Sequence, residues 1–175
     1  MGTTRHEWES VQINDFPIEN IKIFQGGSEY MRGFKIFYRN GQNQLIGTEG
    51  DDVGTVNFEE NDVLIGMTIR FNSQSDKRPR RFGFTLIRNG NIFKSELYGN
   101  SFGHMTQKFW PALSTLYGRQ DVENLKIRKI AWSQWGSGDE DLSGVRFYPF
   151  NGPDSDILGE TRYSWAETEL HQRPI

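Results

Sequence analysis

A nine-residue pattern that occurs twice constrains the fold more than any other feature of the chain. The first copy, GFKIFYRNG, covers residues 33–41, and the second, GVRFYPFNG, covers residues 144–152, an offset of 111. In both copies an Asn-Gly pair follows a mostly apolar run, which is a strong signal for the tight turn of a β-hairpin. Each copy is preceded by a Gly-rich loop and followed by an aliphatic pair and a glycine. A repeated hairpin unit predicts an all-β fold with internal pseudosymmetry.

The composition agrees with one all-β domain. The chain has 175 residues and no segment with the composition of a linker, so we expect a single domain over residues 1–175. Glycine occurs 19 times and aromatic residues make up 14 % of the chain, a balance typical of many strands joined by tight turns. We expect the core sheets to lie within residues 18–150 and residues 151–175 to form a C-terminal extension. Residues 161–165 of this extension either complete a sheet or pack on a neighbouring chain.

Charge and composition exclude several classes of function. The formal net charge of −3 provides no overall attraction to nucleic acid or to an anionic membrane. The chain has no cysteine, which excludes disulfides and Cys-based zinc sites. No apolar run is long enough to span a membrane, and the first residues lack the apolar core of a signal peptide. We therefore expect no binding to nucleic acid, no membrane insertion, and a location in the cytoplasm or secretion without a signal peptide.

The sequence contains no pattern typical of catalysis or of metal binding. His6, His104 and His171 are far apart and lack the spacing of metal ligands. The chain also lacks the Gly-x-Ser-x-Gly motif of serine hydrolases. We therefore expect no enzyme activity, no cofactor and no metal. Paired carboxylates for glycoside hydrolysis stay open at this point, because their separation depends on the three-dimensional structure.

The pattern of apolar residues and turn signals predicts a series of short strands. The expected strands cover residues 18–24, 33–38, 55–58, 63–71, 82–87, 92–97, 125–132 and 142–150, with a further strand that begins at residue 45. The pattern is unclear between residues 102 and 122. Within that region, residues 108–113 are either a short helical turn or an irregular crossing.

The order of these elements resembles the jacalin-related lectins. In the first half, the resemblance rests on GFKIFY at 33–38, DDVG at 51–54 and VNFEENDVLIGM at 56–67. In the second half, FGFTLI at 82–87 resembles an inner strand of the family, and GDEDLSGVRFY at 138–148 resembles its terminal glycine loop and strand. The single motifs are short, and their order and spacing carry the resemblance.

The resemblance covers about residues 18–150 and implies a β-prism of three four-stranded Greek-key sheets with pseudo-threefold symmetry. In this family a Gly-x-x-x-Asp loop binds a sugar: the Asp carboxylate accepts hydrogen bonds from hydroxyls while backbone N–H groups bind a sugar oxygen. In this chain the Asp position falls on Ser143. In the equivalent loop before residue 33, it falls on Arg32. Both loops therefore depart from the family's pattern.

Two loops carry the candidate ligand-binding residues. In residues 136–141, three neighbouring carboxylates suggest a shifted sugar site, in which Asp139 or Asp141 accepts hydrogen bonds from hydroxyls and a tryptophan packs on the sugar face. Residues 25–32 offer backbone donors and a stacking ring. The predicted set is Gly26, Gly27, Tyr30, Trp135, Gly138, Asp139, Glu140 and Asp141. Two other interpretations of residues 136–141 stay open: a solvated acidic turn over core tryptophans, and a Ca²⁺ site.

Two further charged segments have simpler interpretations. Glu49, Asp51 and Asp52 form an acidic turn that either blunts a sheet edge, which we favour, or faces a ligand. Residues 77–81 form a basic cluster without interleaved aromatic residues. This pattern favours a charged loop that discourages pairing at a sheet edge over a phosphate or nucleic-acid site.

The sequence thus predicts a non-catalytic recognition module of the lectin type, whose ligand is a carbohydrate or the glycan of a glycoprotein. A single sugar site of this kind binds weakly, so avidity requires a homo-oligomer, for which residues 151–175 are the candidate contact. The alternative is a protein-interaction or structural module that keeps the fold and has lost sugar binding. Ser143 and Arg32 at the expected Asp positions favour this alternative.

Overall fold

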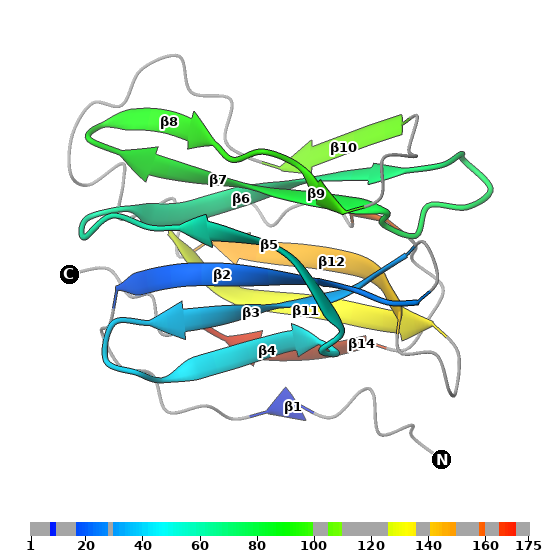
Figure 1. Cartoon of the computed structure of the whole chain (residues 1–175), viewed down its shortest axis with the longest axis horizontal. Coiled ribbons are helices and arrows are strands. Elements are labelled where there is room, and N and C mark those ends of the chain that lie inside the picture. The colour runs from blue at the N-terminus through cyan, green and yellow to red at the C-terminus, as the bar shows by residue number, and fades with distance from the viewer. Residues whose placement is uncertain are drawn as a thin grey trace.

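The structure is a computed structural model, and it describes residues 8–9, 17–27, 30–99, 105–109, 126–135, 141–149, 158–159 and 165–170. Every regular element in these ranges is a β-strand, as the all-β prediction requires. The strands form three sheets (Figure 1). Within the same ranges, no helix is long and apolar enough to cross a membrane.

The first sheet contains the first copy of the sequence repeat. Its strands lie in the order β4 (Asn43–Gly47), β3 (Met31–Tyr38), β2 (Ile18–Gln25), β5 (Asp51–Asn57). β2 and β3 form a hairpin, β4 pairs with β3, and β5 returns to pair with β2. This is the order of a Greek key.

The second sheet has the same order. Its strands are β10 (Met105–Phe109), β6 (Val63–Phe71), β7 (Arg81–Arg88) and β8 (Asn91–Lys94), and the short β9 (Tyr98–Gly99) also pairs with β7. β10 follows the other strands in sequence and pairs with β6, the first of them. The connection therefore repeats that of the first sheet.

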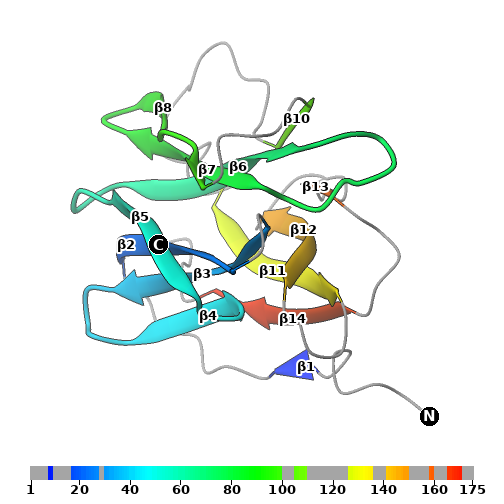
Figure 2. The same ribbon diagram turned by 45° about the vertical axis from the view of Figure 1, so that its right-hand side comes forward.

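The third sheet repeats the order once more and adds an edge strand. Its order is β1 (Trp8–Glu9), β14 (Trp165–Glu169), β11 (Ile127–Trp135), β12 (Asp141–Pro149), β13 (Leu158–Gly159). β11 pairs with β12 and with β14, and β12 pairs with β13, all antiparallel. β1 pairs with β14 in parallel. Figure 2 shows this sheet beside the other two.

The described strands of the predicted extension, residues 158–159 and 165–169, therefore belong to the third sheet and do not lie outside the sheets. Val145 pairs with Leu158, and β14 lies along β11, so this region provides two strands of the third sheet. The predicted core boundary at residue 150 falls inside the third Greek key. The third sheet continues past residue 150 because its third strand follows the repeat, as in the first copy. Leu158 and Gly159 pair with β12 in the way that Ile46 and Gly47 pair with β3.

One local geometry occurs in all three sheets. Gly47, Gly99 and Gly159 have φ angles of +84°, +124° and +94°, in the left-handed region. A Cβ atom added to each would lie 2.4, 2.5 and 2.4 Å from a backbone carbonyl oxygen of the neighbouring strand. These carbonyls belong to Arg32, Arg80 and Ser143, respectively. Residues 32, 80 and 143 therefore occupy equivalent positions in the three sheets.

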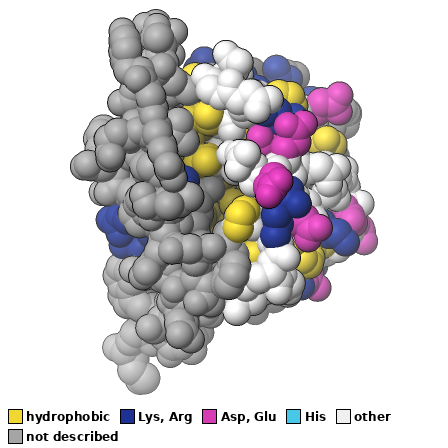
Figure 3. Space-filling model, turned by 90° about the vertical axis from the view of Figure 1, so that its left-hand side faces the viewer, with side chains coloured by type: hydrophobic (Ala, Val, Ile, Leu, Met, Phe, Trp, Pro, Cys, Tyr) yellow, Lys and Arg dark blue, Asp and Glu magenta, His cyan; other side chains and the backbone are white. Residues whose placement is uncertain are grey.

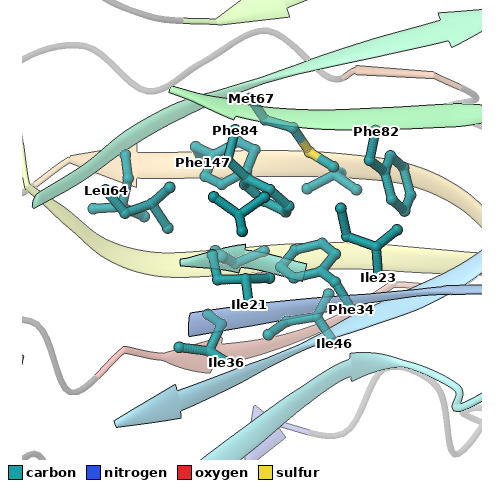
Figure 4. Close-up of a cluster of buried hydrophobic side chains, with 14 of the residues drawn as sticks. Ile21, Ile23, Phe34, Ile36, Ile46, Leu64, Met67, Phe82, Phe84 and Phe147 are labelled. Atoms are coloured by element: carbon teal, nitrogen blue, oxygen red, sulfur yellow. The ribbon is translucent and has the colours of Figure 1, made fainter. Parts of the chain in front are cut away.

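Side chains from the three sheets meet in one apolar core (Figure 4). Phe34 of the first sheet lies edge-on to Phe82 and Phe84 of the second, with ring centroids 5.9 and 5.0 Å apart. In the third sheet, Phe147 stacks on Phe109 at 6.3 Å, which brings β10 and β12 together. Burial of aromatic rings of this size supplies a large share of the stability of such a core.

The predicted strands are present, most of them with bounds that differ by a few residues at one or both ends. Residues 63–71 form a strand with the predicted bounds. The segment around residue 108 belongs to β10, so its described residues are a strand and not a helical turn. The polar Gln107 hides this strand in the sequence, because it sits among the inward positions and accepts a hydrogen bond from the Gly159 N–H at 2.8 Å. The strand predicted over 92–97 ends at Lys94.

Candidate functional site

The strand pairs β2–β3, β6–β7 and β11–β12 are consecutive in sequence, one in each sheet. The end of the first strand and the start of the second strand of each pair lie on the same side of the molecule, on the right in Figure 1. We call this side the loop end; its described residues are 25–27, 30–32, 48–51, 72–80, 135 and 141. The opposite side, the turn end, consists of residues 39–42, 58–62 and 89–90. Figure 3 shows the turn end, where basic and acidic side chains are interspersed.

Gly26 brings the first and third sheets together at the loop end. The Gly26 N–H donates to the carbonyl of Tyr30 at 3.1 Å, which closes the loop before β3. A Cβ atom added to Gly26 would lie 3.0 Å from Cγ and Cδ of Arg32, and 3.2 Å from Oδ1 of Asp141. The two loops that carry the predicted ligand-binding residues are therefore in contact.

The Arg32 side chain runs between two glycines. Its Cδ would lie 3.0 Å from a Cβ atom on Gly26 and 2.9 Å from one on Gly50, so the absence of side chains there makes room for its methylene stem. The Nε atom of Arg32 is buried and has no hydrogen-bond partner. Among the described residues, none accepts a hydrogen bond from its guanidinium. A buried donor left without an acceptor costs about 1–3 kcal/mol of stability.

A cluster around Tyr30 connects the loop before β3 with residues 72–80, the segment between β6 and β7. The Tyr30 hydroxyl donates to Oδ2 of Asp76 at 2.5 Å and accepts from Nη2 of Arg78 at 2.8 Å. Arg78 also donates from Nε to Oδ1 of Asp76 at 3.0 Å. The guanidinium carbons of Arg78 and Arg80 lie 3.8 and 4.9 Å from the centroid of the Tyr30 ring. Arginine guanidinium groups therefore pack against the Tyr30 ring, which the sequence suggested as a stacking surface for a sugar.

The protonation of this cluster follows from its contacts. Burial, followed by the hydrogen bond to Asp76, raises the pKa of Tyr30 above its ordinary value of 10.0. Burial alone would raise the pKa of Asp76 as well, but the hydrogen bonds from Arg78 and Tyr30 outweigh it and lower that pKa below 3.8. At neutral pH the cluster therefore contains a carboxylate, a neutral phenol and arginine cations.

Gln134 and Thr48 form a second bridge between the sheets. The Gln134 side chain donates from Nε2 to Oγ1 of Thr48 at 2.6 Å, and the Thr48 N–H donates to the carbonyl of Arg32 at 3.0 Å. These bonds connect the end of β11 with the segment after β4 and with the start of β3. They fix the position of the Arg32 backbone.

The structure places the predicted site residues in different surroundings. Gly26 lies at the junction of the loops, and Gly27 is exposed, with no atom of a described residue within 4 Å of an added Cβ. Asp141 is only 3 % exposed, beside Gly26. The backbone of Trp135 pairs with Asp141 at the start of the β11–β12 hairpin. Gly138, Asp139 and Glu140 lie outside the described residues, as do His6, His104 and His171.

The acidic turn lies at the start of an edge strand. Asp51 and Asp52 begin β5, which is the outer strand of the first sheet. The Glu49 carboxylate pairs with Nζ of Lys35 at 2.6 Å, and Oδ1 of Asp52 accepts from the Gly54 N–H at 3.1 Å. These contacts support the interpretation of this segment as the border of a sheet.

The sequence did not indicate that residues 72–80, between β6 and β7, belong to the loop end. The sequence favours a charged loop over a phosphate or nucleic-acid site for residues 77–81, and neither interpretation includes the contacts of Arg78 and Arg80 with Tyr30 or the equivalence of Arg80 with Arg32. One signal for this loop is present in the sequence, since Asn89-Gly90 follows an apolar run as the Asn-Gly pairs of the two repeat copies do. Residues 81–90 correspond to a third copy of the repeat, but Arg81 stands where the other two copies begin with glycine, and this difference conceals the copy.

Comparison of the chain with protein-family models, with curated proteins and with solved structures finds no match. The donor groups of the site therefore have to be interpreted by themselves. In the part of the chain that the structure describes, no group of three or more His, Asp or Glu residues is placed to hold a metal ion. What the loop end offers instead is a set of hydrogen-bond donors: the backbone N–H of Gly27, which is exposed, and the guanidinium of Arg32.

Proposed function

We propose that the chain is a β-prism of the jacalin type and a non-catalytic carbohydrate-binding module. Three sheets with the same Greek-key order support the fold, together with the equivalent glycines at 47, 99 and 159. This order is the one that the resemblance to jacalin-related lectins implied. Because fold alone does not define function, the sugar site has to be argued from the loop end.

The contact of Gly26 with Arg32 and Asp141 is the observation that carries this proposal. A sugar presents hydroxyls, which both donate and accept hydrogen bonds, so a sugar site combines donors with acceptors at close range. Here the Gly27 N–H and the Arg32 guanidinium are the proposed donors, since the Gly26 N–H already donates to the Tyr30 carbonyl. The carboxylate of Asp139, from the loop between β11 and β12, is the proposed acceptor, since Asp141 is buried.

The proposed role of Tyr30 differs from the one suggested by the sequence. Because Arg78 and Arg80 lie against its ring, Tyr30 fixes the loop before β3 and does not stack on a sugar. The proposed stacking group is Trp135, whose backbone lies at the same end. One site of this size binds a monosaccharide weakly, so we propose that a homo-oligomer supplies the avidity.

A glycan array of the purified chain is the first test. Hits are titrated against Gly27→Val, which adds a bulky side chain at an exposed position with nothing within 4 Å, and against Asp139→Ala. Glu60→Gln, an exposed carboxylate of the turn end, is the matched control. Loss of binding in the first two variants, with the control unchanged, supports the proposed site. Equal binding by all variants places the sugar elsewhere on the molecule.

The second candidate is a protein-interaction module without sugar binding. Two observations favour it: Asp141 is 3 % exposed, and the Tyr30 ring is occupied by arginines. An array without any saturable hit, combined with capture of a protein partner that Gly27→Val abolishes, would support this candidate and end the lectin proposal.

A further inference from the structure

We propose that the loop end selects acidic saccharides, and that Arg32 binds their anionic oxygen group, a carboxylate or a sulfate. This inference deepens the proposed function and rests on it. A neutral sugar site needs acceptors for hydroxyl protons, whereas the side chain at position 32 has only donors. The chemistry of this position therefore favours a ligand that brings the acceptor itself.

The surroundings of Arg32 point to a missing acceptor. Gly26 and Gly50 enclose its stem, which fixes the direction of the side chain, and its Nε is buried without a partner. Arg32 as a whole is half-buried, and no described residue accepts a hydrogen bond from its Nη nitrogens. A carboxylate or sulfate can bridge two N–H groups of one guanidinium in the planar, bidentate geometry that arginine favours.

Among the residues that the structure describes, the neighbouring acids do not supply this acceptor. The Glu49 carboxylate pairs with Lys35 at 2.6 Å, and Asp76 pairs with Arg78 at 3.0 Å. Asp141 lies beside Gly26, but no ion pair joins it to Arg32. Arg32 therefore differs from Arg78, whose charge is already used inside the protein.

The neighbourhood also provides for the rest of a saccharide. Gly27 follows Gly26, which packs on Arg32, and it is exposed; no described atom lies within 4 Å of an added Cβ there, so a ring can approach its backbone N–H. The anionic group would then dock on Arg32 while ring hydroxyls reach the loop backbone. Specificity would come from the fork of the guanidinium rather than from the net charge of the chain, which is negative.

The experiment compares three sugars that share one ring: glucose, glucuronic acid and glucose 6-sulfate. Each is titrated into the purified chain at about 0.15 M salt, where long-range attraction is largely screened. Binding is followed by the backbone amide signals of residues 26 and 27 in NMR spectra. We expect both acids to bind at least about tenfold more tightly than glucose.

Arg32→Gln should reduce the affinity for both acids to that for glucose. Arg32→Lys keeps the charge without the fork and should retain less than half of the gain for glucuronic acid. The matched control is Arg39→Gln, which removes an exposed arginine from the turn end and should leave all three affinities unchanged. Circular dichroism and thermal unfolding establish that each variant is folded.

The outcomes separate this inference from the proposed function. Glucose binding as tightly as the acids overturns the inference and leaves the sugar module standing. No shift with any of the three sugars overturns both. Equal losses in Arg32→Gln and Arg39→Gln overturn the assignment to Arg32. If inorganic sulfate alone competes as well as glucose 6-sulfate, the site binds a free anion and the saccharide part is wrong.

Discussion

The two ends of the same three sheets treat their arginines differently. At the turn end, Arg88 donates to Asp62 at 2.6 Å, and the Asp62 side chain is 2 % exposed. The hydrogen bond to Asp62 raises the pKa of Arg88 above its ordinary value. At the loop end, Arg32 has a buried Nε without any described acceptor. One arginine completes a buried ion pair of the fold, whereas no described residue accepts a hydrogen bond from the guanidinium of the other.

The glycines of the two ends differ in the same sense. Gly41 of the turn end has a φ of +89° but no atom within 4 Å of an added Cβ, so only its backbone conformation matters. Gly47, which leads into the loop end, combines a φ of +84° with a carbonyl oxygen 2.4 Å away from an added Cβ. Loops at the turn end therefore tolerate change, whereas the frame of the loop end does not. A rigid frame that carries an unsatisfied donor is typical of a binding site.

The largest effect should come from Gly47→Ala. Its new Cβ would collide with the carbonyl of Arg32 in addition to the strain of a positive φ, so we expect a loss of about 3 kcal/mol in unfolding free energy. Gly41→Ala adds the strain without the collision and should lose about 1 kcal/mol. Urea unfolding of both variants measures the difference. Equal losses would show that the close approach at the loop end has no energetic importance.

Arg88→Gln should have the next largest effect. It leaves the nearly buried carboxylate of Asp62 without its cation, so we expect a loss of about 2 kcal/mol in urea unfolding. The double variant with Asp62→Asn removes both charges and should recover part of this loss. A double variant that is less stable than the sum of the single changes would contradict the assigned pairing.

Arg32→Gln should barely change stability, which is the sharpest contrast with Arg88. The substitution removes a buried donor that has no described acceptor, which favours the variant, but it also removes part of the stem that packs between Gly26 and Gly50, so we expect a net change within about 0.5 kcal/mol. The same urea titration provides the measurement, carried out without any saccharide. A loss as large as that of Arg88→Gln would mean that Arg32 stabilises the fold, and the comparison between the two ends would fail.

The strand pattern was predictable where the local signals agree. The repeated Asn-Gly turns and the glycines at 33 and 144 indicate two hairpins, and the structure contains both with Gly33 opposite Gly47 and Gly144 opposite Gly159. Strand β10 was not predicted, since its inward Gln107 breaks the apolar alternation.

The candidate site was less predictable than the strands, because its contacts join distant segments. Nothing local to Tyr30 indicates that Arg78, 48 positions away, would lie on its ring. Likewise, the sequence showed Arg32 only as a departure from an expected carboxylate. Its burial between Gly26 and Gly50 depends on how the loops meet. A run of charges in a sequence does not distinguish a cation that is paired from one that is not.

The smallest expected effect concerns the pH dependence of the Tyr30 cluster. Because the pKa of Asp76 is lowered below 3.8, its contribution to stability is complete above that pH and is lost as the pH falls through the folded value. The raised pKa of Tyr30 acts in the opposite range: its contribution is complete below pH 10.0 and is lost as the pH rises further. Asp76→Asn should therefore flatten the acid part of the stability profile.

The measurement is the unfolding free energy in urea from about pH 5 down to about pH 2, where a shifted carboxylate releases its contribution. Glu60→Gln, an exposed carboxylate of the turn end, serves as the control and should leave the profile unchanged. If Asp76→Asn and Glu60→Gln give the same profile, the Tyr30 cluster does not hold residues 72–80 against the loop before β3. The loop end would then lack the rigid support that separates it from the turn end.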